Sequence, residues 1–139
     1  MWFGVATSRP FFDTNVLVYL IASEPARAQR SATILAAGGC VSVQVLNEFV
    51  SVVRRKQWLD WDAVEAWLEL FRSDLTVVAL TSEIQARATT IARRRQIHIY
   101  DANIIAAAEQ AGCDVVYSED MQDGQVIGGL TIRNPFRDT

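Results

Sequence analysis

The sequence predicts an α/β fold built around a mostly parallel sheet. Short apolar runs rich in β-branched residues alternate along the chain with longer stripes of helical spacing, which is the pattern of strands joined by helices. Helices between strands imply right-handed crossovers and therefore parallel neighbours. With 139 residues, half of them hydrophobic, the chain can form one domain with a buried core. We expect residues 1–139 to form a single domain, with residues 1–10 as a lead-in segment.

The first third of the chain predicts two strands and two helices. The apolar run that begins near residue 10 predicts a strand over residues 10–13, and residues 16–22 continue apolar as a helix. A second helix begins at residues 23–25, because proline suits the first helical turn, and it ends at the glycine pair 38–39. Residues 40–41 then make a short strand.

The middle of the chain predicts three helices around one strand. Ser42 is expected to cap a helix whose apolar face holds Glu48 at its edge. Asp60 can cap the next helix, and the β-branched run at residues 76–80 predicts a strand. Ser82 with Gln85 matches a capping box, so a third helix is expected to begin there. The apolar face of the first of these helices consists of Val45, Leu46, Phe49, Val52 and Val53.

The last third predicts one helix and two strands. Asp101 stands at the head of a helix that ends at Gly112. Residues 114–117 predict a strand, with Asp120 just past its end, and residues 131–132 predict a last strand at the edge of the sheet.

The composition excludes several classes of protein. A formal net charge of −3 and a pI of about 5.1 exclude a generally basic nucleic-acid binder, so nucleic acid would be held by local basic patches or through metal ions. Cys40 and Cys113 form no CxxC motif, and neither a secretory signal nor an apolar run of ~18 residues is visible. We expect a cytoplasmic protein with two reduced thiols and no membrane segment.

Four acidic residues stand at junctions of the predicted elements. Asp13 ends an apolar strand, where a carboxylate without a partner is costly and where open α/β sheets form ligand sites. If the strands at 10–13 and 114–117 are neighbours, Asp13 and Asp120 come together. Clustered carboxylates repel one another, and a bound Mg²⁺ or Mn²⁺ removes that cost. Asp101 taken alone is better explained as a helix N-cap. The four acids are Asp13, Glu48, Asp101 and Asp120.

At these acids the sequence resembles the PIN domain, and it is similar to the toxin nucleases of bacterial VapBC toxin–antitoxin pairs. The resemblance rests on Phe-Phe-Asp-Thr-Asn-Val-Leu at 11–17, Asn-Glu-Phe at 47–49, Tyr-Asp-Ala at 100–102 and Tyr-Ser-Glu-Asp at 117–120. It implies a three-layer α/β/α sandwich and a Mg²⁺- or Mn²⁺-dependent endoribonuclease. It also implies a cognate antitoxin as partner, and it favours a homodimer.

The resemblance assigns roles residue by residue. The four acids named above would be the catalytic residues and the metal ligands. Asn15 and Ser118 would be polar helpers beside the first and last acid, and Asp123 is an alternative or additional fourth acid.

Two basic runs could contact RNA. They lie at the ends of predicted helices, where arginine also interacts favourably with the helix dipole, so both interpretations stay open. Trp58 and Trp61 flank a helix junction and could stack on a base or form a partner surface, whereas Trp67 is expected in the core. His98 is expected to be an ordinary loop histidine. The candidate RNA contacts are Arg54, Arg55, Arg93, Arg94 and Arg95.

Three other functions compete with the nuclease as explanations of this sequence. A dehalogenase-like phosphatase also begins with Asp after an apolar strand, but it needs a second Asp where this chain has Asn15, and a downstream lysine, whereas Lys56 is the only lysine. A response-regulator type of sensor would need a paired acid cluster and a lysine. A non-catalytic PIN-like module that binds RNA or protein is the remaining alternative, and the presence of all four acids argues against it.

Overall fold

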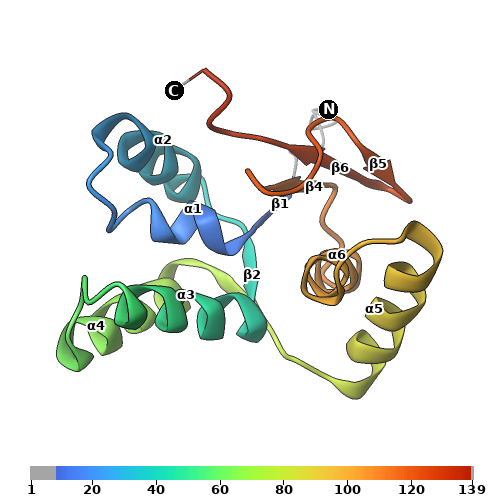
Figure 1. The fold of residues 1–139 in the computed structure, drawn as a ribbon, viewed down its shortest axis with the longest axis horizontal. Helices are drawn as coiled ribbons and strands as arrows, with labels where there is room; N and C mark the ends of the chain where they lie inside the picture. The colour runs from blue at the N-terminus through green and yellow to red at the C-terminus, as the bar shows by residue number, and fades with distance from the viewer. Residues whose placement is uncertain (1–8, 139) are drawn as a thin grey trace, which may run out of the picture.

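The computed structural model describes residues 9–138, which form a mixed sheet flanked by helices (Figure 1). In this described part the sheet has six strands in the order β3-β2-β1-β4-β6-β5, and only β5 is antiparallel to its neighbour. The predicted α/β class with a mostly parallel sheet is therefore confirmed. The strands are β1 (Pro10–Phe12), β2 (Cys40–Ser42), β3 (Thr76–Val78), β4 (Val115–Tyr117), β5 (Val126–Ile127) and β6 (Leu130–Arg133).

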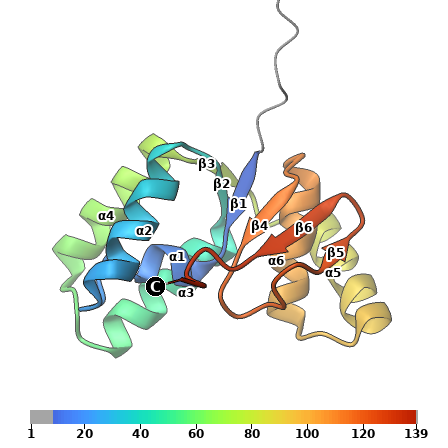
Figure 2. The same ribbon diagram turned by 90° about the horizontal axis from the view of Figure 1, so that it is seen from above.

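The helices divide into two groups. In both ribbon views α1–α4 lie together on one side of the molecule, and α5 and α6 lie on the other (Figures 1 and 2). Helix α6 packs against α5 and also contacts strands β2, β4 and β6. The helices are α1 (Thr14–Val18), α2 (Pro25–Ala36), α3 (Val43–Arg55), α4 (Trp61–Asp74), α5 (Ser82–Arg95) and α6 (Ile99–Gln110).

Burial explains why α6 is apolar almost all round. Its residues 102–108 are all buried, because the helix is covered by α5 on one side and by strands on the other. Asp101, in its first turn, is left at the end of the helix where the strands also end. The fully buried core of the protein includes Phe11, Phe12, Phe49 and Phe136. This packing fixes the direction from which α6 presents its acid.

The strand predictions hold for β1 to β4 and fail at the edge of the sheet formed by β5 and β6. Strands β1 to β4 lie where the sequence predicted them, within one or two residues. The predicted edge strand at 131–132 is part of β6, which pairs with both β4 and β5 and is therefore not an edge. The missed strand β5 turns into β6 through Gly128 and Gly129, a two-residue glycine turn that is a known hairpin signal.

Two helix caps are as predicted and two differ. The Ser42 and Asp60 side chains accept hydrogen bonds from the backbone of the following first turns. Helix α5 is capped by Thr81, whose Oγ1 accepts from the Ile84 N–H at 3.2 Å, so the predicted capping box at Ser82 is wrong. The N-cap of α6 is His98, whose Nδ1 accepts from the Tyr100 N–H at 3.0 Å, so the interpretation of Asp101 as the N-cap is wrong.

Both cysteines are buried and free, as expected. Burial, followed by the nearby Cys40, raises the pKa of Cys113 to about 12, so this thiol stays protonated at neutral pH. At the beginning of the described chain, Pro10 lies in β1, and residues 1–8 of the expected lead-in lie outside the described residues. No helix among residues 9–138 is long and apolar enough to cross a membrane.

Candidate active site

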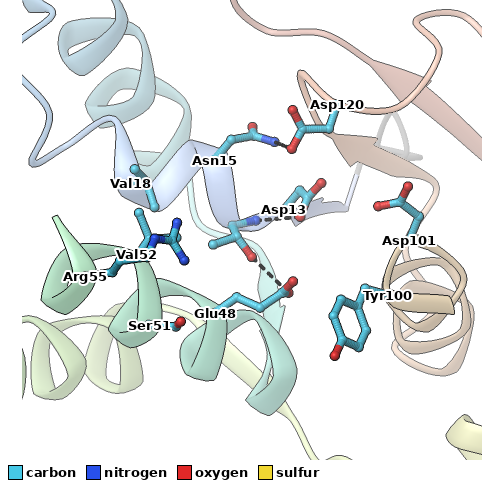
Figure 3. A pocket seen from close by; sticks show the side chains of 11 residues that line it. Asp13, Asn15, Val18, Glu48, Ser51, Val52, Arg55, Tyr100, Asp101 and Asp120 are labelled. Atoms are coloured by element: carbon cyan, nitrogen blue, oxygen red, sulfur yellow. Dashed lines mark hydrogen bonds between the residues drawn. The ribbon is translucent and has the colours of Figure 1, made fainter. Parts of the chain in front are cut away.

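A cavity of about 400 Å³ opens at the C-terminal ends of the central parallel strands β1 and β4 (Figure 3). Four separate segments contribute its walls: the β1–α1 junction, helix α3, the first turn of α6, and the loop after β4. All four predicted acids line this cavity. The lining residues are Asp13, Thr14, Asn15, Val18, Glu48, Ser51, Val52, Arg55, Tyr100, Asp101 and Asp120.

Asp13 is the most buried of the four acids, with only 6% of its surface exposed. It follows β1 in extended conformation and caps α1, so its carboxylate is held at the end of the strand. The Thr14 N–H donates to Oδ1 at 2.6 Å, and the Ser118 hydroxyl donates to Oδ2 at 2.7 Å. Burial raises the pKa of Asp13 from 3.8 to about 6, against the lowering effect of these two hydrogen bonds. The charges of Asp120 and Asp101 also contribute to this rise.

Strand pairing brings Asp120 to Asp13. In the register of β1 with β4, Phe12 lies opposite Tyr117, so both strands end at the same level and both acids follow there. The Asn15 amide donates to Asp120 Oδ2 at 3.3 Å, and the Asp120 N–H donates to Ser118 Oγ at 3.1 Å. Ser118 thus touches both acids, through its hydroxyl and through the backbone of Asp120.

Glu48 and Asp101 reach the cavity from two helices on either side of it. Both carboxylates are half-buried, and burial is the largest cause that raises the pKa of each. Thr14 Oγ1 donates to Glu48 Oε2 at 3.2 Å, and this hydrogen bond lowers the pKa of Glu48. The negative charge of Asp120 adds to the rise in the pKa of Asp101. Burial and the neighbouring like charges therefore disfavour ionisation of Glu48 and Asp101 when no cation is present.

The donor set fits a hard divalent cation. Its oxygens come from carboxylates, with further oxygens from Thr14 and Asn15, and these are ligands that Mg²⁺ and Mn²⁺ prefer. Within residues 9–138 no three Asp, Glu, His or Cys side chains stand close enough together to hold one ion. Since Mg²⁺ commonly binds through one or two carboxylates and keeps several waters, two of these acids would suffice as direct ligands.

Asp123 does not line the cavity. Its carboxylate accepts a hydrogen bond from the Asn134 N–H at 2.8 Å and pairs with Arg137 Nη1 at 2.5 Å. The bond from the Asn134 backbone is the largest cause that lowers the pKa of Asp123. This acid therefore fastens the C-terminal residues to the loop after β4, and Asp120 is the acid that faces the cavity.

Of the five arginines named as candidate RNA contacts, Arg55 lines the cavity. Arg54 instead donates to the Leu59 carbonyl at 3.0 Å and lies over the exposed Trp61 ring at 4.6 Å. The other three, at residues 93–95, are exposed at the C-terminal end of α5 and do not line the cavity. Trp58 is exposed, and Trp67 packs, partly buried, against the core.

Several residues around the site were not predicted from the sequence. Thr14 lies within the motif at residues 11–17, and Ser51 follows Glu48 at a helical spacing of three, so the sequence holds a signal for both. A cluster of Tyr19, Arg27 and Glu119 behind the loop of Asp120 had no such signal, because Glu119 is 100 residues from Tyr19 and 92 from Arg27.

Comparison with known proteins gives a consistent picture. A family model described as PIN domain matches residues 11–122 of this chain. The fold is similar to that of the Mycobacterium tuberculosis toxin VapC20, described as a sarcin–ricin loop cleaving toxin, with 19% identity and a TM-score of 0.67 over 80% of this chain and 89% of that chain. No curated protein matched the chain.

Two toxin–antitoxin complexes contain chains of the same fold. One is from Klebsiella pneumoniae, with 18% identity and a TM-score of 0.68 over 91% of this chain and 97% of that chain. The other is a DNA-bound VapBC complex from Salmonella typhimurium, with 20% identity and a TM-score of 0.66 over 93% and 99%. At these identities the likeness shows a shared fold.

Proposed function

Because this chain belongs to the PIN-domain family, we propose that it is a divalent-metal-dependent endoribonuclease that hydrolyses RNA phosphodiesters. One observation carries the proposal. Four carboxylates from four segments of the chain line a single cavity, and burial or mutual repulsion raises the pKa of three of them. Such an arrangement is unfavourable without a cation, and it is common where a protein binds one for catalysis.

Mg²⁺ or Mn²⁺ is the proposed cofactor. Asp13 and Asp101 are proposed as the first ligands, with Glu48 and Asp120 completing the acidic site. When bound, such an ion would neutralise charge on the scissile phosphate and acidify a water molecule.

The chain's own residues would hold and orient the reacting groups. Ser118 and the Thr14 backbone fix both oxygens of Asp13, so this carboxylate enters the reaction in one orientation. Asp120, exposed at the cavity and held by Asn15, would accept a proton from the attacking water. The Arg55 guanidinium would bind a phosphate oxygen of the RNA. No serine or cysteine nucleophile is needed.

The proposed biological role is that of a toxin inhibited by a cognate antitoxin. Its support is the likeness to the Mycobacterium tuberculosis toxin and to the toxin–antitoxin complexes from Klebsiella pneumoniae and Salmonella typhimurium. A homodimer is proposed as the working state. As a ribonuclease of this kind the protein would act in the cytoplasm, where its RNA substrate is made.

A cleavage assay tests the proposed chemistry. The purified chain is incubated with a mixed single-stranded RNA pool in Mg²⁺, in Mn²⁺ and in EDTA, beside Asp13→Asn. The exposed Asp62 of α4 provides the matched control Asp62→Asn. We expect cleavage by the wild type and by the control in either metal, and none in EDTA or with Asp13→Asn. If the folded wild type cleaves no RNA under any condition, the non-catalytic binding module becomes the better explanation.

A growth assay tests the role as a toxin. Induced expression of the wild-type chain in a bacterium is expected to arrest growth, whereas Asp13→Asn at equal expression is not. Active cleavage in vitro without growth arrest would separate the two parts of the proposal, leaving a nuclease that is not a toxin.

A further inference from the structure

Behind the loop that carries Asp120 lies a cluster of Tyr19, Arg27, Glu119 and Phe136, here called the Arg27 cluster. Its members come from the end of α1, from α2, from the loop after β4 and from the C-terminal residues. The last segment runs from β6 toward the side of the molecule that holds α1 and α2 (Figures 1 and 2), and the Arg30 Nε donates to the Pro135 carbonyl at 3.0 Å. The cluster therefore joins parts of the chain that are distant in sequence.

Arg27 is the centre of the cluster. Its guanidinium lies over the Tyr19 ring at 5.0 Å and over the Phe136 ring at 5.6 Å. Its Nη1 donates to the Tyr19 hydroxyl at 2.6 Å and forms an ion pair with Glu119. The Tyr19 hydroxyl in turn donates to Glu119 Oε2 at 2.5 Å. Stacked and paired in this way, the planar guanidinium has one defined orientation.

The Arg27 cluster touches the cavity through the backbone of Glu119. The Glu119 N–H donates to Asn15 Oδ1 at 3.3 Å, and the amide of the same Asn15 donates to Asp120 Oδ2 at 3.3 Å (Figure 3). On the other side of this short loop, Ser118 is fully buried and bonded to Asp13. The loop is thus held at Ser118 from the cavity side and at Glu119 from the Arg27 side, with the exposed Asp120 next in sequence.

The ion pair of Arg27 with Glu119 also neutralises a negative charge close to the acidic cavity. Glu119 is a fifth carboxylate beside four that already repel one another. Its side chain points to Arg27, whose charge neutralises it and draws it away from the cavity. Without Arg27, the Glu119 carboxylate would be free to compete with Asp120 for Asn15 or for a cation.

We propose that Arg27 is a positioning residue of the acidic site, which fixes Glu119 and through it the place of Asp120 at the cavity. The proposal rests on the proposed function, because it assigns Arg27 a part in metal binding and RNA cleavage without contact with either. Groups that orient a metal ligand from outside the site typically affect metal affinity or activity about 10- to 100-fold.

Three variants separate positioning from mere stability. Arg27→Ala removes the ion pair, Arg27→Lys keeps the charge without the planar fork, and Glu119→Gln keeps the shape of the loop while removing its charge. The matched control is Arg87→Ala, which breaks the ion pair of Arg87 with Glu109 at 3.0 Å between α5 and α6. Thermal unfolding of each variant records how far stability alone has changed.

Two measurements are made on each protein: binding of Mn²⁺ alone, from the signal of free Mn²⁺ in electron paramagnetic resonance, and cleavage of the RNA pool with kcat and KM determined separately. We expect Arg27→Ala and Glu119→Gln to weaken Mn²⁺ binding or lower kcat about 10- to 100-fold with KM little changed. Arg27→Lys should recover part of that loss, and Arg87→Ala should match the wild type.

A double-mutant cycle tests the route of the effect. If Arg27 acts through Asp120, then adding Arg27→Ala to Asp120→Asn should change Mn²⁺ binding and kcat within about twofold, because the group that it positions is already lost. A full additional loss in the double variant would overturn the proposal, and so would wild-type Mn²⁺ binding and kcat in Arg27→Ala.

The outcomes for the wild type distinguish this proposal from the nuclease itself. A wild type that cleaves RNA while Arg27→Ala is unaffected overturns the positioning role alone. A wild type that binds Mn²⁺ but cleaves no RNA, with weaker binding in Arg27→Ala, supports positioning and contradicts the nuclease. A wild type that does neither overturns both.

Discussion

The carboxylate of Asp13 is buried, and its protonation links the site to pH. In the folded protein it holds a proton up to about pH 6, whereas its ordinary pKa is 3.8. Between these values the folded state binds more protons than the unfolded chain, so the free energy of unfolding falls as the pH rises through this window. Above pH 6 the metal-free protein carries the full cost of a buried charge, which a cation would relieve.

Removing that charge should stabilise the metal-free protein. We expect Asp13→Asn to raise the free energy of unfolding at about pH 7 in EDTA by on the order of 2 kcal/mol, and to have no such benefit near pH 4. Urea unfolding at the two pH values, with Asp62→Asn as control, measures this. A variant that is less stable than the wild type at both pH values would show that burial of Asp13 is fully compensated within the fold.

A pair of variants decides which acid is the fourth. Asp120 lines the cavity and Asp123 is engaged by Asn134 and Arg137, so Asp120→Asn should lower the rate of RNA cleavage about 100-fold and Asp123→Asn should leave it near the wild-type value. Cleavage rates under one metal concentration give the comparison. Loss of activity in Asp123→Asn with an intact fold would mean that Asp123 belongs to the acidic site.

At the scale of single residues, the sequence was sufficient for those acids that stand in short motifs. The short motifs predict four acids, and all four line one cavity. They are Asp13, Glu48, Asp101 and Asp120. The contacts that orient them could not be predicted in the same way. Arg27 and Glu119 are 92 residues apart, and a pairing over such a distance leaves no local spacing to read.

At the scale of elements, local patterns predicted most helices and strands because each has its own apolar period. The errors arose where contacts with neighbouring elements determine the local structure. The strand at 131–132 lies inside the sheet because the Gly128–Gly129 turn adds β5 outside it. Helix α6 begins at a histidine cap because the His98 ring nitrogen reaches the Tyr100 N–H, an arrangement that residue preferences do not favour.

At the start of β2, Gly39 lies in close contact with β1. Gly39 has a φ of +153°, and a Cβ there would stand 2.6 Å from the Phe12 ring and from the Pro10 carbonyl of β1. We expect Gly39→Ala to lower the free energy of unfolding by about 2–3 kcal/mol, from strain and overpacking together. Gly38→Ala, where a Cβ meets nothing within 4 Å and only the φ of +83° is strained, should cost about 1–2 kcal/mol. Equal losses would contradict the close approach of β1 to Gly39.

For the whole molecule, the charge distribution matters more than its sum. The chain carries a net charge of −3, and Arg55 is the basic side chain that lines the cavity. We therefore expect an RNA strand to be held at the cavity by few phosphate contacts together with the proposed cation.

Salt dependence tests this expectation. In single-stranded nucleic acid, each phosphate contact contributes a slope of about −0.7 to the plot of the logarithm of affinity against the logarithm of salt concentration. With about one to three such contacts, we expect a slope of about −1 to −2 for RNA binding. Asp120→Asn keeps both proposed first ligands and slows cleavage during the binding measurement, which fluorescence anisotropy can provide at constant Mn²⁺. A slope steeper than about −5 would mean that a larger basic surface than the cavity binds the RNA.

The most direct test of the central claim, that the four acids form one metal-dependent nuclease site, is single-turnover RNA cleavage by metal-stripped protein to which Mn²⁺ is returned in steps. The predicted result is no cleavage by the stripped wild type, saturable recovery with Mn²⁺, and no recovery in Asp13→Asn or Asp101→Asn, which remain folded. Full cleavage by the stripped protein, or equal recovery in those variants, would contradict the claim.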